Sequence, residues 1–155
     1  MESNNGIDIV RLINQGGVYS DVEGDDLESV YKNAIDQINL PEYLDKEEVL
    51  KGLISRENLL STAVGGGVAI PHSSSNLIKN VGEQLVAVVY LKQPLQVQTP
   101  DLKPVTTLFI ILTMNSYYHM KVLDTLSGLL KNIHFRNAIN NQVNAPILTT
   151  IIKGL

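Results

Sequence analysis

Three consecutive glycines, followed by a short apolar run, a proline and a histidine, constrain this chain more than any other stretch. Residues 61–72 read Ser-Thr-Ala-Val-Gly-Gly-Gly-Val-Ala-Ile-Pro-His. Glycines permit positive φ angles and close backbone approach, and the apolar run after them is typical of a short buried strand. Pro71 lacks an N–H group, so a buried strand cannot continue through it. We therefore expect His72 at the carboxyl end of a strand, where α/β sheets usually hold their ligands.

Two longer segments also predict buried strands. Residues 84–91 and 106–113 are continuous runs rich in apolar and β-branched side chains, which is typical of strands that are covered on both faces of a sheet. An alternating stretch at 18–23 predicts a further strand. The connection between the two long runs contains Pro94, Pro100 and Pro104, so it can form an edge strand at most.

Helical periodicity accounts for most of the remaining chain. Apolar residues predict amphipathic helices at 7–13, 26–39, 46–57 and about 116–131, with shorter helices at 133–140 and 146–153. Asp45 with Glu48 resembles a capping box, and Ser116 is the expected N-cap of the fourth helix. Helices that alternate with buried strands predict an α/β sandwich, in which a mixed β-sheet is covered by helices on both faces. With 155 residues and no interior linker or repeat, we expect a single domain over residues 1–155.

Composition and charge argue against several classes of function. The formal net charge is −4 and no basic cluster is present, so a nucleic-acid partner is not expected. The longest apolar run has about seven residues, against about 20 for a membrane span. The chain has no cysteine, which excludes disulfides and thiolate metal sites. The first five residues lack the features of a signal peptide, so we expect a cytoplasmic protein.

The glycine–histidine segment belongs to a longer pattern, which extends over nearly the whole chain and is densest over residues 56–132. Its residues are Arg56-Glu57, Ser61-Thr62, Gly65, Val68 to His72, Pro94, Asp101, Pro104-Val105, Leu108 to Leu112, His119, Leu123 and Leu126. This pattern resembles enzyme IIA of the bacterial phosphoenolpyruvate-dependent sugar phosphotransferase system. The similar class is the fructose/mannitol class, which includes nitrogen-type regulatory members. Ser73 departs from the Gly, Ala, Cys or Pro that usually follows the histidine, so the subgroup stays open.

The resemblance implies a phosphocarrier, a phosphotransferase component with a phosphohistidine intermediate. His72 would accept a phosphoryl group on Nε2 from the phosphohistidine of HPr and pass it to an enzyme IIB domain during sugar uptake. No metal and no other cofactor is implied. The residue chemistry agrees, because imidazole with an unperturbed pKa of about 6.5 is partly neutral and nucleophilic near neutral pH. The alternative is that His72 only caps or packs at the strand end.

Two further side chains are candidates for a role beside His72. His119 lies on the apolar stripe of its helix, near the N-terminus, where the dipole favours an anion by roughly 0.3–1 kcal/mol and disfavours imidazolium. It would orient His72 or donate an N–H group to phosphoryl oxygens, as the resemblance also implies, unless it is a satisfied core histidine. Arg56 would supply donors to those oxygens, or else it is a surface charge that suits the end of its helix. His134 lies outside the pattern and is expected on the surface.

Three residues of the glycine segment are candidate phosphoryl ligands. Ser61 and Thr62 would contribute a hydroxyl group, although both would serve equally to cap the loop backbone. Gly67 would allow the backbone to approach the phosphoryl group. The glycines do not form a nucleotide-binding P-loop, because no Gly-Lys-Ser/Thr follows them.

Other functions stay open beside the transport phosphocarrier. A nitrogen-type regulatory module would be phosphorylated at the same histidine, and the added charge would control binding to a regulatory partner without sugar transport. A zinc hydrolase that uses His72 and His119 is a weaker alternative, since the sequence has no His-Glu-x-x-His pair. Because two partners must reach the same histidine, we expect an exposed apolar rim around it that includes Leu59, Leu60 and Val64.

Overall fold

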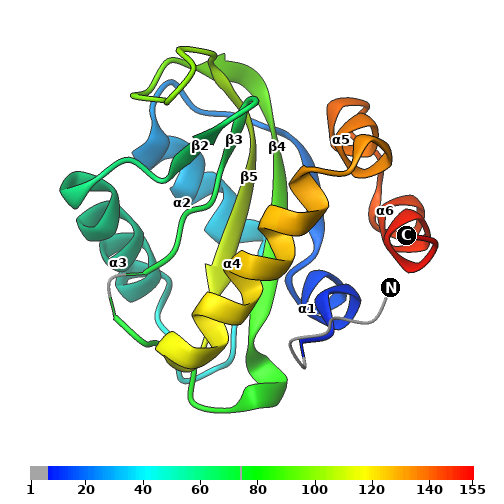
Figure 1. The fold of residues 1–155 in the computed structure, drawn as a ribbon. Helices are drawn as coiled ribbons and strands as arrows, with labels where there is room; N and C mark the ends of the chain where they lie inside the picture. Colours follow the sequence, from blue (N-terminus) through cyan, green and yellow to red (C-terminus); the bar gives the residue numbers. More distant parts are fainter. Residues whose placement is uncertain (1–6, 74) are drawn as a thin grey trace.

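The fold is built on a five-stranded mixed sheet with the strand order β1-β4-β5-β3-β2 (Figure 1). The structure is a computed structural model that describes residues 7–73 and 75–155, so the signal-peptide prediction lies outside the described residues. β4 runs antiparallel to β5, whereas β1 is parallel to β4 and β3 is parallel to β5. The strands are β1 (Val18–Val22), β2 (Ala63–Gly65), β3 (Val68–Ala69), β4 (Leu85–Leu95) and β5 (Val105–Leu112).

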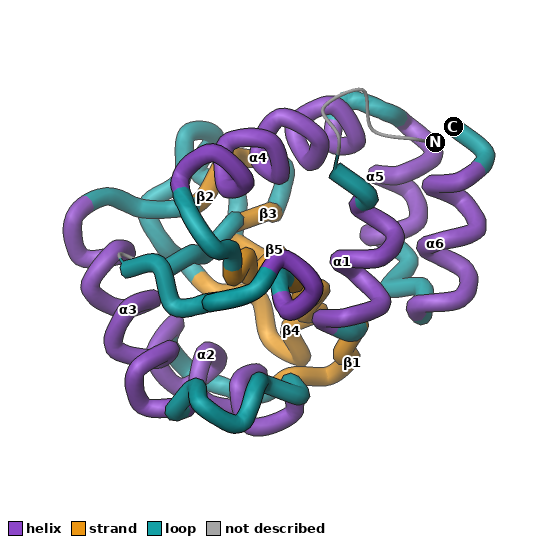
Figure 2. Tube along the Cα trace, turned by 90° about the horizontal axis from the view of Figure 1, so that it is seen from below, coloured by secondary structure: helices purple, strands orange, loops and turns teal. Residues whose placement is uncertain are grey.

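Helices cover both faces of the sheet, as the sequence predicts (Figures 1 and 2). One face carries α2 (Leu27–Gln37) and α3 (Lys46–Leu59). The opposite face carries α1 (Ile9–Gly16), α4 (Ser116–Leu130), α5 (Ile133–Asn140) and α6 (Ala145–Lys153). A short 3₁₀ helix (Val81–Glu83) precedes β4. In the described ranges, no helix is long and apolar enough to cross a membrane.

The two helical layers explain why the central strands are continuously apolar. Along β4, Val86, Val88 and Tyr90 pack into the core on the side of α1 and α4. The intervening residues Leu85, Ala87 and Val89 pack into the core on the side of α2 and α3. Since successive side chains of a strand point to opposite faces, a strand between two cores has no solvent-facing positions to fill with polar residues.

The glycine segment forms a tight hairpin that the sequence analysis did not identify. β2 and β3 pair antiparallel across Gly66 and Gly67, whose φ angles are 64° and 81°. Two-residue hairpin turns of this kind require positive φ at both central residues, which glycine adopts without steric cost. The glycines therefore reverse the chain, so that β3 enters the sheet beside β5.

The chain after β3 follows β5 toward the amino end of α4. Pro71 accepts a hydrogen bond from Ile111 N at 2.9 Å, and His72 pairs with Ile111 as an isolated parallel bridge. β5 ends at Leu112 and α4 begins at Ser116. The predicted location of His72, at the carboxyl end of a sheet strand, is therefore confirmed, and α4, the helix that follows β5, starts nearby.

Several element boundaries and caps differ from the sequence-based predictions, and α1 covers Ile9–Gly16 rather than 7–13. β4 extends to Leu95 and includes Pro94, but its register with β1 ends at Leu91, so the added residues pair on one side only. Ser116 is not the N-cap of α4, because the Asn115 side chain accepts the hydrogen bond from Tyr118 N instead. Asn and Ser are about equally good caps, and the extended backbone at Asn115 decides between them. Asp45 does cap α3, but its carboxylate bonds to Glu47 N rather than to Glu48.

Candidate active site

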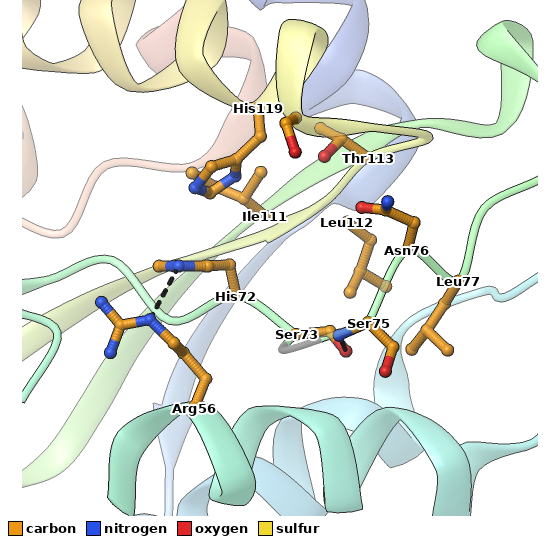
Figure 3. A pocket seen from close by; sticks show the side chains of 11 residues that line it. Arg56, His72, Ser73, Ser75, Asn76, Leu77, Ile111, Leu112, Thr113 and His119 are labelled. Carbon is orange, nitrogen blue, oxygen red and sulfur yellow. Dashed lines mark hydrogen bonds between the residues drawn. The ribbon is translucent and has the colours of Figure 1, made fainter. Parts of the chain in front are cut away.

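Arg56, His72 and His119 come from three different elements and line one cavity of about 280 Å³ (Figure 3). Arg56 lies in the last turn of α3, His72 follows β3, and His119 lies in the first part of α4. The remaining lining residues are mostly small or polar: Ser73, Ser75, Asn76, Leu77, Ile111, Leu112, Thr113 and Ser116. The structure thus brings together the three residues that were predicted to act on one phosphoryl group.

Hydrogen bonds define the protonation of the His72 ring. Its Nδ1 lies 3.1 Å from the carbonyl oxygen of Ile70. A carbonyl oxygen only accepts, so Nδ1 carries the proton. The other nitrogen, Nε2, accepts a hydrogen bond from Arg56 Nε at 3.1 Å, which requires a lone pair on Nε2. Both contacts fit one neutral tautomer, with the proton on Nδ1 and the lone pair on Nε2.

The surroundings of His72 favour its neutral form. Burial lowers the pKa of His72 below its usual value, and the positive charge of Arg56 lowers it further. The hydrogen bond to the Ile70 carbonyl and the charge of Glu57 act in the opposite direction. Since the net shift is downward, the ring is neutral near pH 7 and keeps the lone pair on Nε2.

His119 packs against His72, with ring centroids 4.2 Å apart and an angle of 42° between the ring planes. Its side chain is half-buried at the margin of the helix stripe, whereas Val122, Leu126 and Leu129 are fully buried. Burial lowers the pKa of His119 to about 4, with smaller contributions from His72 and Arg56. A neutral His119 still has one N–H donor, so it remains able to donate to an anion beside Nε2.

The Arg56 guanidinium is held by two acceptors. Nε donates to His72, and Nη1 donates to the carbonyl oxygen of Leu60 at 2.7 Å. A guanidinium carries five N–H donors, so most of them are not used by these two hydrogen bonds. A cation with further donors therefore lies beside His72 Nε2.

The other three predicted phosphoryl ligands do not line this cavity. Ser61 Oγ donates to Gln98 O at 2.6 Å and accepts from Ala63 N, which matches the loop-capping alternative. Thr62 Oγ1 donates to Glu57 Oε1 at 2.6 Å. Gly67 lies in the hairpin turn before β3, where its carbonyl accepts from Thr106 N and Thr107 N. His134 is exposed, as predicted.

Ser73 has a packing role that was not predicted from the sequence. A Cβ atom added at Gly52 would lie 2.1 Å from Ser73 Oγ and 3.0 Å from Ser73 Cβ. Gly52 is buried in α3, so the residue after His72 rests directly on the helix that carries Arg56. The contact couples the two sides of the cavity. A glycine inside a helix was the available signal, because it is unfavourable there without a packing reason.

The charged residues of the described chain offer no third metal ligand here. Within residues 7–73 and 75–155, no group of three or more His, Asp or Glu side chains is arranged to hold a metal ion. Among these described residues, His72 and His119 therefore form a pair without the third protein ligand that catalytic zinc sites use.

A pair of half-buried histidines with their rings in contact, and an arginine hydrogen-bonded to the unprotonated nitrogen of one of them, is a site suited to a transferable anion. The chain matches the family model for the phosphoenolpyruvate-dependent sugar phosphotransferase system, EIIA 2, over residues 11–154. The protein therefore belongs to this family of phosphoryl-transfer domains. The predicted family is confirmed.

Similar proteins include nitrogen regulatory proteins and, in fold, an enzyme IIA that forms a complex with an enzyme IIB. A nitrogen regulatory protein of Pseudomonas aeruginosa is 29% identical over 115 residues, which cover 73% of this chain and 72% of that protein. The crystal structure of nitrogen regulatory protein IIA-Ntr from Neisseria meningitidis has a TM-score of 0.75 and 28% identity, over 88% of this chain and 92% of that one. Enzyme IIAMTL of Escherichia coli, in complex with phosphorylated enzyme IIBMTL, has a TM-score of 0.69 at 13% identity, over 90% and 95% of the two chains. At this level of identity, the similarity to enzyme IIAMTL is a similarity of fold alone.

Substitution of Gly52 tests the packing of Ser73. We expect Gly52→Ala to lower the free energy of unfolding by about 1–3 kcal/mol, because the new methyl group overlaps Ser73. Ser73→Gly removes both overlapping atoms, so the double variant should be more stable than Gly52→Ala alone. Gly128→Ala in α4 is the matched control, since nothing lies within 4 Å of its added Cβ. Urea denaturation measures all three. Equal stability of Gly52→Ala and Gly128→Ala would contradict the contact.

The low pKa of His119 predicts a loss of stability in mild acid. In the unfolded chain a histidine binds its proton near pH 6.5, whereas folded His119 binds it only at about pH 4. The unfolded state thus binds more protons across this window, and the free energy of unfolding falls as the pH falls from about 6.5 to 4. Urea denaturation at several pH values should show a smaller fall for His119→Gln. Exposed His134→Gln serves as the control, and an equal fall in all three proteins would contradict the assignment.

Proposed function

We propose that this protein is a phosphohistidine phosphocarrier, in which His72 accepts a phosphoryl group from the phosphohistidine of HPr and passes it to an enzyme IIB domain. The observation that carries the proposal is the tautomer of His72. Its Nδ1–H group is hydrogen-bonded to the Ile70 carbonyl, the lone pair on Nε2 accepts from Arg56 Nε, and the His119 ring packs against the same imidazole. Membership of the family supports the same role, as well as a cytoplasmic location.

The transfer step needs no proton movement on His72. The Nε2 lone pair forms a bond to phosphorus, while the bond between phosphorus and the donor imidazole breaks and its electron pair stays on the donor nitrogen. The His72 ring then carries the phosphoryl group on Nε2 and the proton on Nδ1. The Ile70 carbonyl oxygen, 3.1 Å away, stabilises this more positive ring. When the phosphoryl group leaves for the next acceptor, the ring returns to the same neutral tautomer.

Arg56 and His119 are suited to the charge of the transferred group. Phosphoryl transfer depends mainly on positioning and on stabilising negative charge on the equatorial oxygens. Arg56 occupies the Nε2 lone pair in the unphosphorylated protein, so its guanidinium must move onto the phosphoryl oxygens as the group arrives. Charge-assisted bonds from guanidinium to phosphate are strong and often bidentate. Neutral His119 adds an N–H donor on the opposite side.

Exposed apolar side chains on the elements that carry the site residues, and on the neighbouring β2, would form the surface that partner proteins approach. Leu59, Leu60 and Val64, the predicted rim, are 79%, 66% and 49% exposed. Tyr117 and Met120, on either side of His119 in α4, are also exposed and were not predicted. The fold relative from Escherichia coli forms a complex with a phosphorylated enzyme IIB, which supports an enzyme IIB domain as the acceptor.

A nitrogen-type regulatory module is the second candidate function. The names of the similar proteins from Pseudomonas aeruginosa and Neisseria meningitidis favour it. In this case the same phosphorylation would control binding to a regulatory partner, because the added phosphoryl charge changes the surface around His72. Transfer onward to an enzyme IIB domain, measured with the phosphorylated protein, separates the two functions. Genes for a sugar permease or for nitrogen regulators beside the gene for this protein would give independent support.

The central experiment is phosphorylation by phosphoenolpyruvate, enzyme I and HPr. We expect acid-labile phosphate on the wild-type protein and none on His72→Ala. His119→Ala should slow labelling or shorten the lifetime of the phosphorylated form, because one donor to the phosphoryl oxygens is lost. His134→Ala is the matched control and should label at the wild-type rate. Undiminished labelling of His72→Ala would refute the proposal, and a wild-type rate for His119→Ala would remove His119 from the mechanism.

A further inference from the structure

The carboxylate of Glu57 is held by three hydrogen-bond donors close to the site. Tyr31 OH and Thr62 Oγ1 donate to Oε1, at 3.1 and 2.6 Å, and Thr62 N donates to Oε2 at 3.1 Å. Tyr31 belongs to α2 and Thr62 to the segment that leads into β2, so the carboxylate ties both to the end of α3. Glu57 follows Arg56 directly, but it is not among the residues that line the cavity.

A continuous path of hydrogen bonds leads from this carboxylate to the His72 ring. Glu57 holds Thr62 through both its backbone N–H group and its hydroxyl group. The carbonyl oxygen of Thr62 accepts a hydrogen bond from Ile70 N at 3.0 Å. Ile70 in turn accepts from His72 Nδ1 at 3.1 Å. Thr62 and Ile70 are buried, so the path runs through well-packed backbone. The orientation of the Ile70 carbonyl, which selects the tautomer of His72, is therefore linked to Glu57.

We propose that Glu57 is a positioning residue for phosphoryl transfer: it clamps Thr62 and so holds the Ile70 carbonyl that keeps the proton on His72 Nδ1 and the lone pair on Nε2. The inference rests on the proposed phosphocarrier function. It assigns the acidic residue of the Arg56-Glu57 pair a role separate from that of Arg56, which contacts the nucleophile directly.

A carboxylate suits this position better than an amide. An ionised carboxylate accepts on both oxygens, which matches the donors that Tyr31 and Thr62 present. A glutamine would turn an NH₂ group toward one of these donors and lose at least one of the three bonds. The negative charge of Glu57 also raises the pKa of His72, whereas the positive charge of Arg56, from the same helix, lowers it. His119, the other titratable group beside His72, comes from α4 and is neutral.

The chain contains a matched tyrosine–glutamate pair outside the site. Tyr43 OH donates to Glu83 Oε1 at 2.7 Å, and Asn80 Nδ2 donates to the same oxygen at 2.8 Å. Glu83 lies in the short 3₁₀ helix before β4 and does not line the cavity. Glu83→Gln therefore removes a comparable hydrogen-bonded carboxylate without touching the path to His72.

The test combines two measurements on Glu57→Gln, Thr62→Val and Glu83→Gln. Nitrogen-15 NMR of the imidazole rings reports which nitrogen of His72 carries the proton, and rapid-quench kinetics with phosphorylated HPr reports the rate of transfer. For Glu57→Gln we expect a mixture of tautomers and a maximal rate about tenfold lower, since slight misplacement of a reacting group is costly. The KM for HPr should be unchanged, because the exposed rim is intact. Thr62→Val, which keeps its backbone N–H bond, should show the same changes to a smaller degree.

The outcomes separate this role from a merely structural one. A tautomer shift and a slower maximal rate in Glu57→Gln, with wild-type behaviour of Glu83→Gln, support the proposal. A wild-type tautomer in Glu57→Gln overturns it, whether or not transfer slows. If Glu57→Gln does not fold, Thr62→Val decides by the same two criteria. Should the wild-type protein accept no phosphoryl group at all, the phosphocarrier function fails, whereas the tautomer measurement still decides the link from Glu57 to His72.

Discussion

The hydrogen bond from His72 Nδ1 to the carbonyl oxygen of Ile70 is the interaction on which the site depends. It joins two residues that flank Pro71, so it requires the chain to leave β3 and stay beside β5. The proline stops the strand, and the bridge from His72 to Ile111 keeps the chain in place. With the proton held on Nδ1, the other nitrogen is left with its lone pair toward Arg56. The chemistry of His72 is thus determined by backbone geometry.

The mixed sheet explains how distant residues meet at this histidine. β3 and β5 are parallel, so their carboxyl ends lie at one edge of the sheet, and only three residues separate the end of β5 from the start of α4. His119 therefore reaches the His72 ring from one helical layer, while Arg56 reaches it from α3 in the other layer (Figure 3). The cavity lies between the two layers, where burial keeps both imidazoles neutral.

Local patterns predicted what depends on neighbouring residues, and failed where distant contacts decide. The strands at 84–91 and 106–113 follow from continuous apolar runs, and the end of β3 before Pro71 follows from the proline. His72 and His119 were predicted both from their positions, at a strand end and on a helix, and from the motif. Arg56 was predicted as part of the motif.

The hairpin was missed because its turn depends on strand pairing across Gly66 and Gly67. Ser61 and Thr62 were ambiguous, since their partners Gln98 and Glu57 are set by the tertiary fold. Nothing local indicates that Tyr31, 26 residues away, binds Glu57.

The most direct test of this account is the position of phosphorus on the His72 ring. Phosphorus-31 and nitrogen-15 NMR of the phosphorylated protein distinguish a phosphoryl group on Nε2 from one on Nδ1. We expect phosphorus on Nε2, with a proton retained on Nδ1 and hydrogen-bonded to the Ile70 carbonyl. A phosphoryl group on Nδ1 would require that bond to break, and it would contradict the account.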